Sequence, residues 1–218
     1  MAKLDIPQDI IDNVIDVVAD DTNSLKQCSL VSSSFLLPSR KHLFSRISIR
    51  GERSCEGIHQ LLLQNPFIQP CVKSITMNFS RYRQWVDNTS ILVILRLPFC
   101  CLERFAIYLP RNSSHCQWDA MDWNHDCESW DWNYFGNEFR EALGNIMLSS
   151  TLKTLSLNGI TNLPISFFVY IAPLTTLELD TISPSDFFDD SSSLQIHPAS
   201  NGVIERCVWR FRSGYAQR

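Results

Sequence analysis

The repeat on which this fold is built reads Leu152-Lys153-Thr154-Leu155-Ser156-Leu157-Asn158-Gly159-Ile160. Residues 174–182 copy it closely. In both copies an apolar residue is followed by a second one three positions later and by a third two positions after that. The last two share one face of a β-strand, since side chains alternate along an extended chain. One copy cannot form a core alone, so we expect the copies to stack side by side as parallel strands.

The same apolar spacing returns in three more degenerate copies, so that the five copies begin at residues 72, 102, 152, 174 and 204. Their starts differ by 30, 50, 22 and 30 residues. A period of about 20–30 residues is typical of leucine-rich repeats. The interval of 50 is either one unit with a large insertion or two units of which one is unreadable. The alternative is a non-repeat α/β domain whose strands begin alike.

Helix-like segments separate these strands, at residues 58–63, 91–97, 139–147 and 167–171. Asn65-Pro66, Pro98 and Pro173 end three of them, because proline cannot continue a helix. Alternation of strands and helices predicts an α/β fold with a parallel sheet.

The N-terminal region has a different pattern, in which apolar residues follow helical spacing. A helix is expected to begin at Pro7 and to carry a stripe wider than one small neighbour would cover. A second helix follows a cap at Asp21 or Thr22, Pro38 starts a third, and the alternation of Ile47 and Ile49 predicts a strand. One face of the first helix has Ile10, Val14 and Val17, and next to it lie Ile11, Ile15 and Val18.

These residues resemble an F-box, particularly the F-box-like proteins of fungi. The likeness lies in Ile-Pro-x-Asp-Ile-Ile at 6–11, Ser-Leu-x-x-Cys-Ser-Leu-Val-Ser at 24–32, Phe35, and Arg-x-x-Leu-Phe at 40–44. Ile6 replaces the family's leucine, and a serine replaces the basic residue usual between Val31 and Phe35. The resemblance implies a three-helix module that binds a Skp-type adaptor, and thereby the cullin and RING subunits of a ubiquitin ligase. The adaptor contacts that it implies are Ile6, Pro7, Ile10, Ile11, Leu30 and Val31.

The expected organisation is an F-box-like domain at 4–49, a junction at 50–65, and an irregular leucine-rich-repeat-like solenoid at 66–211. In fungal F-box proteins such irregular arcs select a target protein, and the resemblance implies the same here. The alternative for the first part is a helical subdomain that packs entirely on its own chain.

An acidic, tryptophan-rich insertion occupies residues 110–136. Exposed aromatic residues among carboxylates would suit a basic partner segment, and the simpler interpretation is an insertion with some tryptophans folded into the core. Zinc is not predicted, because His115, Cys116, His125 and Cys127 lack the spacing of a zinc site. The candidate partner-binding residues are Trp118, Trp123, Trp130 and Trp132.

Composition argues against several classes of function. The chain has 218 residues, a net charge of −4 and 44% hydrophobic residues, which is typical of a globular protein. Its basic residues are scattered, which argues against nucleic acid, and they form no evident pocket for a phosphorylated target. No apolar run has the length of a membrane span and no secretory signal is visible. We therefore expect a cytoplasmic or nuclear protein with eight reduced cysteines.

The sequence favours binding over catalysis. It has no glycine-rich phosphate loop and no Gly-x-Ser-x-Gly elbow, and its histidines are dispersed. We expect no catalytic residue, metal or cofactor, and partners limited to the Skp–cullin complex and an unknown target protein. Two alternatives stay open: a small hydrolase or metal-dependent enzyme that uses the insertion, or a degenerate structural protein.

Overall fold

The computed structural model describes residues 6–79, 88–109, 130–164, 174–180 and 206–210. A six-stranded parallel sheet organises most of them, and each strand pairs with the next one of that sheet along the chain. Mixed helices and parallel strands confirm the α/β class. The strands, in spatial order, are β1 (Arg46–Ile49), β2 (Ser74–Asn78), β3 (Arg104–Tyr108), β5 (Thr154–Asn158), β7 (Thr176–Asp180) and β8 (Arg206–Arg210).

The five copies of the sequence pattern become β2, β3, β5, β7 and β8 in that order. The strand that Ile47 and Ile49 predicted is β1. The apolar residue that opens a copy lies beneath the strand, and it is fully buried in the four copies where its side chain is described. These residues are Val72, Leu102, Leu152 and Leu174.

The same hydrogen-bond arrangement introduces each of the strands β2, β3, β5 and β7. The first strand residue and the residue before it both donate their amides to one carbonyl of the previous unit, at 2.8 to 3.0 Å. This shared geometry fixes the register from one unit to the next. The amide pairs and their acceptors are Lys73 and Ser74 on Ser45, Glu103 and Arg104 on Lys73, Lys153 and Thr154 on Glu103, and Thr175 and Thr176 on Lys153.

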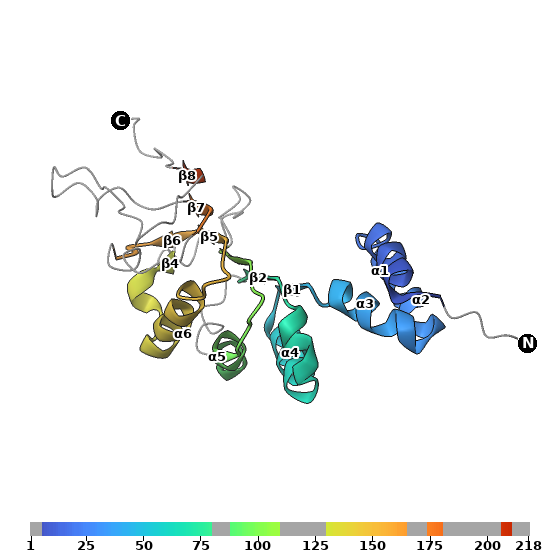
Figure 1. The fold of residues 1–218 in the computed structure, drawn as a ribbon. Coiled ribbons are helices and arrows are strands. Elements are labelled where there is room, and N and C mark those ends of the chain that lie inside the picture. The colour runs from blue at the N-terminus through green and yellow to red at the C-terminus, as the bar shows by residue number, and fades with distance from the viewer. Residues whose placement is uncertain (1–5, 80–87, 110–129, 165–173, 181–205, 211–218) are drawn as a thin grey trace, which may run out of the picture.

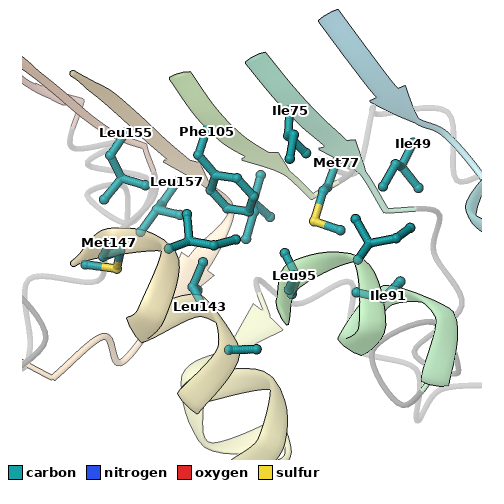
Figure 2. Packing of buried hydrophobic residues seen from close by; sticks show 14 of the residues in the cluster. Ile49, Ile75, Met77, Ile91, Leu95, Phe105, Leu143, Met147, Leu155 and Leu157 are labelled. Atoms are coloured by element: carbon teal, nitrogen blue, oxygen red, sulfur yellow. The ribbon is translucent and has the colours of Figure 1, made fainter. Parts of the chain in front are cut away.

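Helices α4 (Glu52–Gln64), α5 (Thr89–Arg96) and α6 (Asn137–Met147) lie along one face of the sheet (Figure 1). They confirm three of the four predicted helical segments, and the fourth, at 167–171, lies outside the described residues. Figure 2 shows Met77 and Phe105 of the strands facing Leu95 of α5 and Leu143 of α6. Together with the 3₁₀ helix η1 (Pro66–Cys71), these elements form the larger core.

A second sheet has two strands, one from the long interval between the second and third copies and one directly after the third copy. Its strands are β4 (Trp130–Asp131) and β6 (Ile160–Thr161), and η3 (Trp132–Tyr134) leads into α6. Gly159 joins β5 to β6 at φ +84°, and a Cβ there would lie 2.8 Å from the Cβ of Leu109. Only glycine combines that backbone conformation with so close an approach.

The N-terminal helices are α1 (Gln8–Val17), α2 (Thr22–Val31) and α3 (Ser33–Leu43). Asp21 caps α2 by accepting the amides of Asn23 and Ser24, as expected. The third helix begins earlier than predicted, because Ser32 is extended and ends α2. Pro38 therefore lies inside α3 and donates no amide hydrogen bond. The carbonyl of Ser34, which such a bond would have used, accepts one from the Gln8 side chain at 3.2 Å.

The boundary between the two parts also lies earlier than predicted. β1 pairs with β2, and Ile47, Ile49, Cys55 and Leu62 belong to the larger core. Residues 46–64 are thus the first strand–helix unit of the sheet rather than the end of the helical module and a junction. Local spacing could not predict this boundary, because the apolar face of β1 is buried only when β1 pairs with β2.

Candidate functional site: an exposed apolar face on the N-terminal helices

Helix α1 has two apolar faces, and the folded chain covers one of them. Ile11 and Ile15 point into a small core with Leu25 of α2, and partly buried side chains from α2 and α3 surround them. The other face stays in contact with solvent. Its members and their exposed fractions are Ile6 54%, Ile10 49%, Val14 47% and Val17 86%.

Helical geometry explains why three of these side chains form one stripe. At 100° per residue, Ile10, Val14 and Val17 fall within an arc of about 60°, and the buried pair lies beyond its edge, whereas Ile6 precedes the helix and its cap residue Pro7. On the other flank the helix presents Asp9, Asp12 and Asp16, which are exposed. We call the four apolar residues the α1 stripe.

Polar contacts hold α1 in this orientation. Asp16 Oδ1 lies 2.8 Å from Nε2 of His42 on α3, and Gln8 bonds the Ser34 carbonyl as described. Both contacts tie α1 to α3, so the helix cannot roll to hide the stripe without losing them. The exposed stripe is therefore a consequence of how α1 docks.

Two further exposed apolar residues come from the end of α2. Leu30 is 80% exposed and Val31 is 68% exposed, although a residue of either type is usually buried. Leu37 of α3 is exposed as well. Clusters of exposed apolar side chains on a soluble protein commonly mark interaction surfaces.

The exposed area of the α1 stripe determines how much binding free energy a partner could gain by covering it. Complete burial of an aliphatic side chain contributes about 1.5–3 kcal/mol. About half of each of three α1 stripe residues, and most of Val17, is still available. Covering the stripe would therefore contribute roughly 4–6 kcal/mol before the costs of association are subtracted.

Five of the six predicted adaptor contacts are exposed, and one is not. Ile6, Pro7, Ile10, Leu30 and Val31 are accessible. The prediction was wrong for Ile11, because its side chain is only 3% exposed and lies in the small core. Ile10 and Ile11 are neighbours in sequence, and a turn of 100° separates them, so only the packing of α1 decides which one is free.

The predicted tryptophan surface is corrected at Trp132. This residue is 5% exposed, and its ring lies 5.7 Å from that of Phe135, which stacks in turn on Phe139 at 5.0 Å. Trp132 is therefore a core residue. The side chain of Trp130 is not among those described, and Trp118 and Trp123 fall in the range 110–129, outside the described residues.

Groups with catalytic potential are few in the part of the chain that the structure describes. His59 Nδ1 lies 3.0 Å from Ser90 Oγ and joins α4 to α5, but Ser90 is only 9% exposed. Burial raises the pKa of the Cys55 thiol to about 12, with smaller effects from Glu56 and Glu52, so it stays protonated at neutral pH. No group of three or more His, Cys, Asp or Glu residues there could hold a metal ion.

One hollow of about 340 Å³ lies between the C-terminal ends of α5 and α6. Leu95, Pro98, Phe99 and Ile146 give it apolar walls. Its cation, Arg96, is 3.3 Å from Glu138. Glu138 is not a lining residue, and the lining includes no carboxylate and no histidine, so the hollow does not bring a set of catalytic groups together.

Comparisons with protein-family models, with curated proteins and with solved structures each give no match. Among the described residues, no helix is long and apolar enough to cross a lipid bilayer. The geometry of the α1 stripe and of the sheet is therefore the basis for a functional assignment.

Proposed function

We propose that the chain is a substrate-recognition adaptor of an SCF-type ubiquitin ligase, acting in the cytoplasm or the nucleus. The α1 stripe, with Pro7, Leu30 and Val31, would bind a Skp-type adaptor. The strand–helix units, taken as an irregular leucine-rich-repeat-like solenoid, would bind a target protein.

The observation that carries this proposal is the α1 stripe itself. It lies on the helix whose sequence resembles the start of an F-box, and five residues that the resemblance nominates are exposed. A helical subdomain that packed only on its own chain would bury the α1 stripe, because about 4–6 kcal/mol would favour doing so.

The sheet supports the second half of the proposal. Its strands follow the chain in order, and α4, α5 and α6 lie along one face only (Figure 1). On the opposite face Arg46, Arg104 and Tyr108 are exposed and Thr76 is half-buried, whereas Ala106 and Ser156 are buried. The exposed part of this face would bind the target, at a surface separate from the one for the adaptor.

Binding to a purified Skp-type adaptor tests the proposal. Val17→Asp is the test variant, because its side chain is the most exposed of the α1 stripe and its replacement would put a charge into an apolar interface. Leu63→Asp is the matched control, since Leu63 is 50% exposed on α4, away from the stripe. We expect Val17→Asp to abolish adaptor binding and Leu63→Asp to leave it unchanged. Equal binding by wild type and Val17→Asp would overturn the proposal.

A further inference from the structure

The register of the sheet brings distant basic residues into one row. The residues that begin the strands lie opposite one another across the sheet. In β1, β2, β3, β5 and β7, alternation directs these side chains away from α4, α5 and α6, because the next residue of each strand faces the helices. In these five strands the first row, in spatial order, is Arg46, Ser74, Arg104, Thr154 and Thr176.

The row contains arginines and hydroxyl residues and no acid. Arg46 is 81% exposed, Arg104 is exposed, and Ser74 lies between them. Thr154 and Thr176 continue the row with half-buried hydroxyl residues. Every position of the row can therefore donate a hydrogen bond through its side chain.

The acidic groups near the row do not neutralise it. Asp20 lies 3.5 Å from Arg46, and both side chains are highly exposed, so the pair is weak and exchanges easily. Glu103, which precedes Arg104, lies 3.4 Å from Lys153. Glu178 belongs to the next row of the same face. A chain with a net charge of −4 thus has a locally basic strip at this edge.

The spacing of the arginines indicates what kind of anion would fit. Neighbouring strands are about 4.8 Å apart, so Arg46 and Arg104, two strands apart, are separated by about 10 Å at the backbone. Such spacing suits several separate carboxylates better than a single phosphate group, around which cations would need to converge. A polyproline-II segment advances about 3.1 Å per residue with three residues per turn, so every third side chain lies on one face and recurs at about this interval.

We propose that this row binds an acidic segment of a partner protein in the polyproline-II conformation, with Asp or Glu at every third position and its chain laid across the strands. The arginines would pair with the carboxylates, and the hydroxyl groups between them would donate to the peptide. The inference rests on the proposed function, since it names the chemistry of the target that the solenoid would select. It also goes beyond the sequence, in which the basic residues looked scattered.

Fluorescence anisotropy with the full chain and a short labelled peptide tests this. The probe has aspartate at every third position and serine between; its comparison peptides have the same aspartates in one block, asparagine instead of aspartate, or a single phosphoserine. We expect the spaced peptide to bind tightest and to weaken as salt is raised. Arg104→Glu and Arg46→Glu should each weaken it about tenfold or more.

Arg53→Glu is the matched control, because Arg53 is exposed on α4 and the change in net charge is the same. It should leave the affinity within about twofold. Asp20→Asn should tighten binding, since it frees Arg46. If Arg104→Glu shifts the unfolding midpoint, Arg104→Gln removes the cation without adding an acid and gives the same comparison.

Three outcomes would overturn the inference: no loss of peptide affinity in the row variants, an equal loss in Arg53→Glu, or tightest binding by the single-phosphoserine peptide. Adaptor binding measured on the same samples keeps the two proposals distinguishable. Row variants should retain the adaptor, and Val17→Asp should retain the peptide. A failure of either comparison contradicts its own proposal and leaves the other in place.

Discussion

Ile10 and Ile11 are adjacent in sequence, and the structure predicts opposite consequences for their substitution. Ile10 is 49% exposed on the α1 stripe, whereas Ile11 is 3% exposed in the core that α1 shares with α2. A change at Ile10 should therefore act on the interface and leave the fold intact. A change at Ile11 should act on the fold first.

The expected magnitudes follow from these exposures. A partner that covers Ile10 buries its remaining half, which contributes about 1 kcal/mol, so Ile10→Ala should weaken adaptor binding roughly fivefold. Ile10→Asp puts an unpaired carboxylate into the same contact and should weaken binding by more than about a hundredfold. Ile11→Ala removes buried atoms and should destabilise the helical module by about 2–4 kcal/mol, while Ile11→Val should cost only about 1 kcal/mol.

Two probes separate these effects in one sample. No tryptophan lies in residues 1–84 and Trp132 lies in the larger core, so tryptophan fluorescence does not report α1, α2 and α3 directly, whereas far-UV circular dichroism does. Adaptor affinity is measured by isothermal titration calorimetry. Ile10→Asp should lose binding with both unfolding curves unchanged, and Ile11→Val should keep binding. Loss of binding in Ile11→Val together with full binding in Ile10→Asp would refute the orientation of α1 and the site built on it.

Three further predictions concern the fold and its dependence on pH. Gly159→Ala should destabilise the sheet by about 2 kcal/mol or more in urea unfolding, because residue 159 has a positive φ and its Cβ would lie 2.8 Å from that of Leu109. Gly57→Ala, in α4 with nothing within 4 Å, should instead stabilise the protein by about 0.5–1 kcal/mol. A change of stability in the same direction for both variants would contradict this prediction. Because burial raises the pKa of Cys55 to about 12, its stabilising effect is complete below about pH 8.5 and is lost as the pH rises towards 12. Unfolding should therefore become easier above pH 9 in wild type and less so in Cys55→Ala, and a thiol reagent should leave Cys55 unmodified in the native protein at neutral pH. The hydroxyl of Ser24 and two backbone amides lower the pKa of Asp21, so its capping contribution is present above about pH 4 and is lost as the pH falls. Asp21→Ala should therefore remove that part of the acid dependence of helicity. An acid transition that is the same in wild type and Asp21→Ala would contradict the capping role of Asp21.

Local pattern was sufficient wherever one unit determined its own conformation. The apolar spacing at 152–160 predicts a strand because alternation along an extended chain does not depend on neighbours, and β5 lies within it. The cap at Asp21 was predictable for the same reason, since its acceptor and donors lie within three residues. The start of α3 was not, because Pro38 lies inside the helix and the carbonyl that it leaves without an amide, that of Ser34, accepts from Gln8 of another helix.

The candidate site divides in the same way. Residue types and a period of 3.6 were enough to predict that α1 has more apolar surface than one neighbour can cover. The apolar spacing also predicted the six strands of the main sheet, but not the short pair β4 and β6. Packing between elements was needed to establish that Ile11 is buried while Ile10 is free, that Trp132 belongs to the core, and that Arg46 and Arg104 stand in one row. The physical reason is that exposure and register depend on which elements pack together, and packing joins residues that no local spacing relates.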